Sequence, residues 1–163
     1  MKKNFLFLAL CFFAGLSLLP AKSPEAASFS SPESLVSDLY QQSDKGHSPF
    51  FQTKQRGLLD RYFTLPLAAL IWKEAVSSKG EVGALDFNPL YEAQDWQIRK
   101  LSFYSTSPNP PQGKGDTEVI ASFDNMGHKK KVIYSLISTK TGWKISNITY
   151  RDGRTLVGIL IGK

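Results

Sequence analysis

The stretch "TEVIASFDNMGHKKKVIYSLISTKTGWKISNITY", residues 117–150, decides the fold of this chain. Apolar side chains occupy every second position in its first part, as Val119, Ala121 and Phe123 do, and the same period returns after residue 131. A two-residue period is typical of a β-strand with one buried face. The short turn sequences "NMGH" and "STKTG" separate the apolar runs, so the stretch predicts antiparallel hairpins.

Two of the predicted strands interrupt this alternation. The apolar positions change parity between Ile98 and Leu101, and they change again between Ile145 and Ile148. One extra residue inside each interval restores a common buried face by forming a β-bulge. Because bulges bend and twist a sheet, we expect four antiparallel strands in a strongly curved sheet.

The residues before these strands have helical spacing. Ser-Pro-Glu at residues 31–33 is the typical order of an N-cap, a first-position proline and a first-turn acid. Apolar side chains at helical intervals then predict helices near residues 32–42, 53–63 and 64–78. We therefore expect an α+β fold in which N-terminal helices pack in the concave face of the bent sheet, forming a cone. The apolar ending "TLVGILIG" is expected to dock on the core as a short strand or a helical turn.

Residues 1–28 have the pattern of an export signal. Two lysines precede an apolar run at residues 5–19, and small residues follow before Phe29. The run is too short for a comfortable membrane span. The sequence predicts a signal peptide at residues 1–28 and one domain at residues 29–163, located in the periplasm or secreted, with no stable membrane span after cleavage.

Composition excludes several kinds of chemistry. Cys11 is the only cysteine; it lies inside the apolar run and follows Leu10, so the sequence does not predict a lipoprotein. The formal charge is +6, and removal of three lysines and one glutamate with the signal leaves +4 without an arginine-rich stripe, so nucleic acid is not an expected partner. The only two histidines, His47 and His128, fall in predicted loops. We predict no metal site and no cofactor.

The segment "ALDFNPLYEAQDW" and the ending "GWKISNITYRDG" resemble the bacterial exported domain-of-unknown-function family 3828. That family is similar to the nuclear-transport-factor-two-like, cystatin-like cone superfamily. The resemblance implies a cone fold and export, and it supplies no function. Asn88 and Asn147 stand where the family pattern has aspartate. The matching residues are Asp86, Phe87, Pro89, Leu90, Gln94, Asp95, Gly142, Trp143, Lys144, Ile145 and Ile148.

Two carboxylates in the first of these segments are candidate catalytic residues. Asp86 or Asp95 would act as a general base if apolar walls at the cone mouth raised its pKa. A structural interpretation competes with this one. Asn88 would cap a short helix that begins at Pro89, Asp86 would accept backbone N–H groups, and Gln94 with Asp95 would tie down the helix end. In that interpretation three apolar side chains seal the seam between helices and sheet, namely Phe87, Leu90 and Trp96.

The function expected from the sequence is binding without catalysis. We expect an exported module that binds a small ligand or an envelope protein. The alternatives are an isomerase- or hydrolase-type enzyme with an Asp base, and a periplasmic inhibitor or immunity-type protein. Aromatic side chains at such spacings are also typical of a core. The candidate ligand-binding residues are Tyr62, Trp72, Tyr91, Gln94, Tyr134 and Tyr150.

Overall fold

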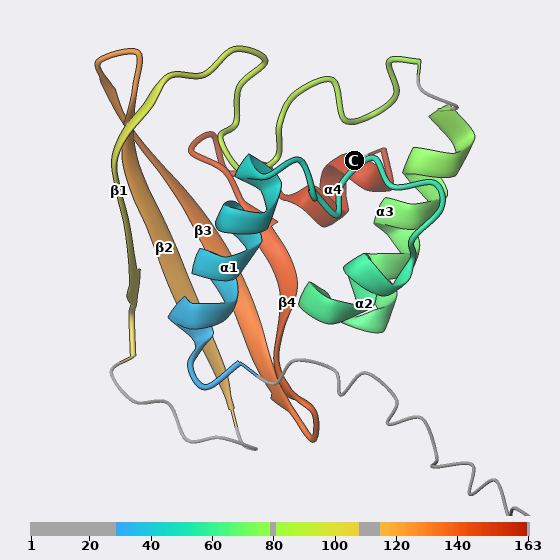
Figure 1. The fold of residues 1–163 in the computed structure, drawn as a ribbon, viewed down its shortest axis with the longest axis horizontal. Helices are drawn as coiled ribbons and strands as arrows, with labels where there is room; N and C mark the ends of the chain where they lie inside the picture. Colours follow the sequence, from blue (N-terminus) through green and yellow to red (C-terminus); the bar gives the residue numbers. More distant parts are fainter. Residues whose placement is uncertain (1–28, 79–80, 108–114, 163) are drawn as a thin grey trace, which may run out of the picture.

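The computed structural model describes residues 29–78, 81–107 and 115–162. The predicted export signal at residues 1–28, with Cys11, lies outside the described residues. The chain is an α+β protein with a four-stranded antiparallel sheet whose strands neighbour one another in sequence order (Figure 1). The strands are β1 (Ile98–Ser105), β2 (Asp116–Asn125), β3 (His128–Thr139) and β4 (Gly142–Thr149).

The helices contact one face and one edge of this sheet. Figure 1 shows α1 lying across the face of the sheet, with α2 and α3 beyond β4. The apolar ending was predicted to form a short strand or a helical turn, and it forms the helical turn. Leu156 in this turn is buried. None of the helices in the described ranges is long and apolar enough to cross a membrane. The helices are α1 (Pro32–Asp44), α2 (Gly57–Tyr62), α3 (Leu65–Ser78) and α4 (Leu156–Leu160).

The predicted hairpin between β2 and β3 is confirmed. Asn125 pairs with His128, and the two residues between them, Met126 and Gly127, have φ angles of 49° and 82°. Positive φ at both central positions is the geometry of a type I′ turn, whose twist matches that of the flanking strands. The long loop between β1 and β2 is described only at its ends, since residues 108–114 lie outside the described residues.

Both predicted β-bulges are also present. The register between β1 and β2 shifts between Arg99 and Ser102, where Lys100 has a φ of 55°. The register between β3 and β4 shifts after Ser135, which leaves Ser146 opposite no single residue. The bulges keep the apolar side chains on either side of each shift on one buried face, as the change of parity in the sequence required.

The helix ends follow the sequence less closely. Ser31 caps α1 as predicted: its Oγ accepts from the Ser34 backbone N at 3.1 Å. Helix α2 begins at Gly57, four residues later than predicted, because residues 53–56 are all exposed and have no apolar side chain to bury. Its last turn is fixed from outside, since Lys144 Nζ on β4 donates to the carbonyl oxygens of Asp60 and Arg61 at 2.7 and 2.8 Å.

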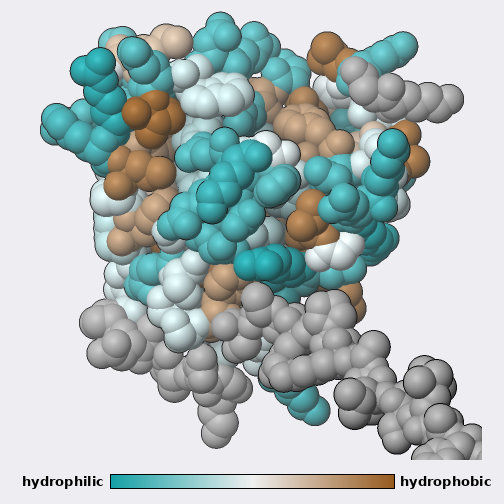
Figure 2. Space-filling view, in the orientation of Figure 1, coloured by the Kyte–Doolittle hydropathy of each residue, from teal (hydrophilic) through white to brown (hydrophobic). Residues whose placement is uncertain are grey.

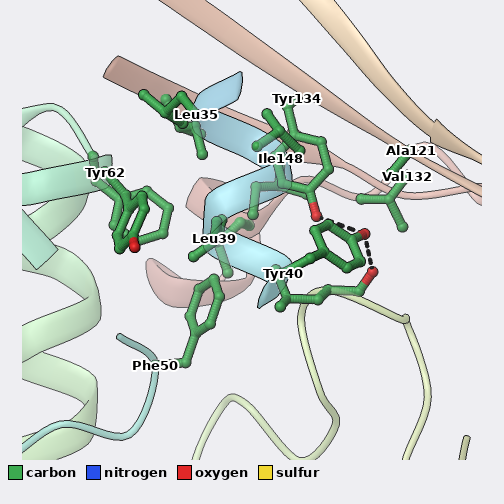
Figure 3. Packing of buried hydrophobic residues seen from close by; sticks show 14 of the residues in the cluster. Leu35, Leu39, Tyr40, Phe50, Tyr62, Ala121, Val132, Tyr134 and Ile148 are labelled. Carbon is green, nitrogen blue, oxygen red and sulfur yellow. Dashed lines mark hydrogen bonds between the residues drawn. The ribbon is translucent and has the colours of Figure 1, made fainter. Parts of the chain in front are cut away.

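The core lies between the helices and the sheet, and it contains a chain of buried phenols (Figure 3). The Tyr134 hydroxyl donates to the Tyr40 hydroxyl at 2.9 Å, and the Tyr40 hydroxyl donates to the Leu90 carbonyl oxygen at 2.6 Å. This chain joins β3, α1 and the segment that follows α3. It therefore fixes the position of a segment that has no regular secondary structure of its own.

Candidate functional site: a groove beside helix α3

An open groove of about 1110 Å³ lies between the end of α3 and the segment 81–96, which leads from α3 toward β1. Phe51, from the connection between α1 and α2, forms its third side. Figure 1 shows this segment as the long loop that runs over the top of the molecule. In Figure 2, brown and tan apolar side chains gather in the upper right of the view, over this part of the fold.

The walls of the groove hold an unusual share of the exposed apolar surface. The described residues include eight exposed large apolar side chains, and four of them line the groove. Contiguous exposed apolar surface is typical of interaction sites on folded proteins. The four are Phe51, Val76, Val82 and Trp96, with exposed fractions of 54, 45, 85 and 48 %; the other four are Leu65, Tyr104, Met126 and Ile161.

A hydrogen bond holds the segment against α3. The Ala84 backbone N donates to Glu74 Oε1 at 2.5 Å. Glycine beside it leaves this bond undisturbed, because a Cβ added at Gly83 would lie 2.1 Å from the same oxygen and the Glu74 carboxylate would have to shift. Gly83 therefore lets the segment lie close enough to α3 to form a wall of the groove.

Phe51 is held in an uncommon backbone conformation. Its φ is 63°, in the left-handed region that bulky side chains rarely adopt. The preceding residue, Phe50, is buried, and its ring lies 5.4 Å from that of Phe63. The left-handed turn thus buries Phe50 in the core while it leaves the Phe51 ring exposed at the groove. Such conformations cost free energy and tend to occur at functional sites.

A tight turn closes the other end of the segment, and here one prediction is confirmed and another is wrong. Asn88 Oδ1 accepts from the Leu90 backbone N at 3.0 Å, as expected for a capping residue. The predicted helix after Pro89 does not form. Asn88 N instead donates to the Ala93 carbonyl oxygen at 2.8 Å and closes a hairpin-like turn. The turn buries Leu90.

The two candidate carboxylates do not make the hydrogen bonds that the structural interpretation predicted. Asp86 and Asp95 are exposed, and neither carboxylate makes a hydrogen bond or ion pair within the described residues. The expectation that Asp86 accepts backbone N–H groups is wrong, since Asn88 takes that role. The expected tie through Gln94 and Asp95 side chains is also wrong: Asp95 contributes only its carbonyl oxygen, which accepts from Asn125 Nδ2 at 3.5 Å. Asp86 lines the groove.

The six candidate ligand-binding residues do not line one site, although three of them, Tyr91, Tyr134 and Tyr150, lie together around Tyr40. Tyr62, Tyr91, Tyr134 and Tyr150 are buried in the core. Burial raises the pKa of all four phenols above the ordinary value, so they stay protonated at neutral pH. Trp72 is half-buried against the core. Gln94 is the one of the six that lines the groove.

Trp96 is exposed, where the sequence predicted that it would seal the seam with Phe87 and Leu90. Its ring stacks on Tyr91 at a centroid distance of 5.5 Å, and Trp96 lines the groove. Leu90 is fully buried and Phe87 is half-buried, so those two do pack as predicted. The stretch before β1 is irregular, which frees Trp96 from the alternation that buries residues of the strand.

Sequence reasoning missed most of the groove. No periodic pattern in the sequence distinguished three of its lining residues from core or loop residues, namely Phe51, Val76 and Val82. Two weak signals were present: Val76 lies outside the main apolar stripe of α3, and Val82 is an isolated apolar residue beside Gly83. A single exposed apolar residue is common on folded proteins, so only the gathering of several around one groove indicates another use.

The described residues contain no group of three or more His, Cys, Asp or Glu side chains that could hold a metal ion. Comparisons with protein-family models, with curated proteins and with solved structures gave no match for this chain. The groove therefore has to be interpreted from its own geometry, and the resemblance to family 3828 stays a prediction.

Proposed function

We propose that the protein is a non-catalytic exported module of the cell envelope that binds a ligand or partner protein through the groove beside α3. The observation that carries this proposal is the gathering of four exposed large apolar side chains around one groove. The Glu74 hydrogen bond and the left-handed Phe51 both hold walls of this groove. An exposed apolar surface that is fixed in place before binding loses little conformational entropy when a partner covers it.

The same geometry gives little support to an enzyme. A general base needs a raised pKa and a position within hydrogen-bond reach of the substrate proton, which enclosed sites provide. Asp86 is exposed on an open groove, and Asp95 does not line it. No histidine is among the described lining residues. A periplasmic inhibitor or immunity-type protein is one form that a partner-binding module can take.

We propose, further, that the fold is the cone of the nuclear-transport-factor-two-like and cystatin-like proteins. Its support is the pair of bulges in a four-stranded antiparallel sheet and the position of α1 across one face. Tyr40, Tyr134 and their apolar neighbours fill the space between α1 and the sheet, so binding would take place outside this core, at the groove.

Hydrogen exchange can test the proposed function. Protein expressed from the full chain is mixed with an extract of the cell envelope of its own source, and backbone exchange is measured by mass spectrometry. We expect slower exchange at residues 81–87 with the extract than without it. A variant with Val82→Ser and Trp96→Ala should lose this protection.

Tyr104→Ala is the matched control. Tyr104 on β1 is 49 % exposed, nearly the same as Trp96, and it does not line the groove. The control should keep the protection that the groove variant loses. Equal protection in all three proteins, or none in the wild type, would refute binding through this groove.

A further inference from the structure

We propose that the occupant of the groove is a peptide segment in which an aliphatic side chain lies next to a lysine or arginine. This inference rests on the proposed function of the groove and names its partner. Three features of the described residues carry it: unpaired backbone groups along one wall, the sign of the charge at the groove, and a small, partly apolar hollow that shares lining residues with the groove.

The backbone of the wall offers hydrogen bonds that the protein itself does not use. From Val82 to Phe87, the Ala84 N–H is the one backbone group that makes a hydrogen bond within the described residues. Four of these six residues, Val82, Leu85, Asp86 and Phe87, line the groove. A peptide main chain supplies matching donors and acceptors, as it does when it pairs with an exposed strand edge. A purely apolar ligand would cover these groups and leave them without partners, which costs free energy.

The groove is acidic on a basic chain. Glu81 and Asp86 are the ionisable residues among its described lining, and Glu74 lines the adjoining hollow. The whole chain carries a formal charge of +6, or +4 without the predicted signal, so a pair of carboxylates in the groove differs in sign from the net charge of the protein. The Asp86 carboxylate makes no hydrogen bond or ion pair within the described residues. A cation on the occupant would complement both carboxylates.

The floor of the groove continues into a hollow of about 20 Å³. Ile71, Ala75, Leu85 and Phe51 give the hollow apolar surface, and Glu74, Ser78 and Glu81 give it polar surface. Such a volume holds about one water-sized group. The tip of a leucine, isoleucine or valine side chain matches its size and would contact the apolar side, and a lysine beside that residue would lie near the carboxylates of the rim.

Synthetic peptides test this chemistry directly. A panel of short capped peptides, in which the position of leucine relative to lysine varies, is titrated into protein expressed from the full chain. Binding is followed by calorimetry and by hydrogen exchange at residues 81–87. We expect saturable binding of at least one leucine–lysine peptide, weaker binding at higher salt, and loss of about tenfold in affinity when glutamate replaces lysine.

Two carboxylate variants make a matched pair. Asp86→Asn removes a charge from the groove and should weaken binding of the basic peptide about two- to fivefold, the usual effect of an exposed ion pair. Asp95→Asn removes another exposed charge, which has no side-chain partner within the described residues and lies outside the groove, and should leave binding unchanged. A peptide with N-methyl groups on its backbone amides should bind more weakly than its parent, since it cannot donate to the wall.

The outcomes separate this inference from the proposed function. If the glutamate peptide or the N-methylated peptide binds as well as the leucine–lysine peptide, the peptide chemistry is refuted. Absence of binding across the whole panel, together with protection of residues 81–87 by the envelope extract, refutes the peptide and leaves the proposed function standing. Absence of protection by either the panel or the extract refutes both.

Discussion

Three buried tyrosines allow the structural argument to be tested with one kind of substitution. Tyr40, Tyr134 and Tyr150 are each at most 3 % exposed, and removal of the hydroxyl by substitution with phenylalanine leaves the ring in place. The three hydroxyls differ in their hydrogen bonds. Tyr40 donates to Leu90 and accepts from Tyr134, Tyr134 donates to Tyr40, and the Tyr150 hydroxyl has no partner among the described residues.

The expected free energies of unfolding follow from these partners. Tyr40→Phe breaks two hydrogen bonds and leaves the Leu90 carbonyl and the Tyr134 hydroxyl buried without partners, so it should cost about 2–4 kcal/mol. Tyr134→Phe breaks one bond and leaves the Tyr40 donation intact, for a cost of about 1 kcal/mol. Tyr150→Phe breaks none and removes an unsatisfied buried group, so stability should stay equal or rise by about 1 kcal/mol.

Urea unfolding followed by circular dichroism measures these differences, with the slope m checked for a common two-state transition. The order of stability should be Tyr150→Phe at or above wild type, then Tyr134→Phe, then Tyr40→Phe. If hydrogen exchange around Leu90 is faster in Tyr40→Phe but not in the other two variants, the lost stability is located in the turn that ends the groove segment. A Tyr40→Phe variant as stable as the wild type would refute the assigned chain of hydrogen bonds. A Tyr150→Phe variant that loses more than about 1 kcal/mol would refute the assignment of its hydroxyl as a group without a partner.

Two further predictions follow from single contacts. Gly83→Ala should displace the Glu74 carboxylate, weaken its bond to Ala84 and lower the free energy of unfolding by about 1 kcal/mol. Gly57→Ala in α2 should keep or raise the free energy of unfolding, because a Cβ added there would meet no atom of another part of the chain within 4 Å. Equal effects of the two substitutions would contradict the close approach; urea unfolding decides. Burial acts to raise the pKa of the Asp38 carboxyl, but hydrogen bonds from Tyr62 and Gln42 and the Arg61 cation together hold that pKa below its ordinary value of 3.8. When a carboxyl has a lower pKa in the folded state than in the unfolded state, its ionised form stabilises the fold. This stabilisation is complete at pH values above the unfolded-state pKa, and it is lost as the pH falls through the folded-state pKa. The difference in free energy of unfolding between wild type and Asp38→Asn should therefore be largest above about pH 4 and shrink below it. Unfolding measured at several pH values on both sides of about pH 4 tests this. A difference that stays constant with pH would exclude a contribution from the ionised Asp38 carboxylate.

Features that depend on neighbouring residues could be predicted from the sequence. The two-residue period placed β2 and β3, and the changes of parity placed both bulges, because each follows from which side of a strand a side chain takes. Ser31 as the cap of α1 and the type I′ hairpin at Met126 and Gly127 are equally local. The start of α2 was predicted too early, because helical residues without an apolar face need tertiary packing that residues 53–56 do not receive.

The candidate site was decided by tertiary structure. Its walls come from Phe51, from Val76 at the end of α3 and from the segment 81–96, and no local period connects three separate parts of the chain. The sequence showed that the segment 81–96 is rich in acidic and aromatic residues. It did not show which of these side chains would be buried in the core.

The sequence by itself determined an α+β chain with four antiparallel strands and two bulges, because side-chain period and turn chemistry act over a few residues. Only the tertiary structure decided that Asn88 closes the turn while Asp86 lies exposed at a groove, and that Tyr91 is buried beneath an exposed Trp96. The physical reason is that segments far apart in the sequence compete for the same core volume and for the same backbone hydrogen-bond partners. The side chains left outside that arrangement form the surface that we propose binds a partner.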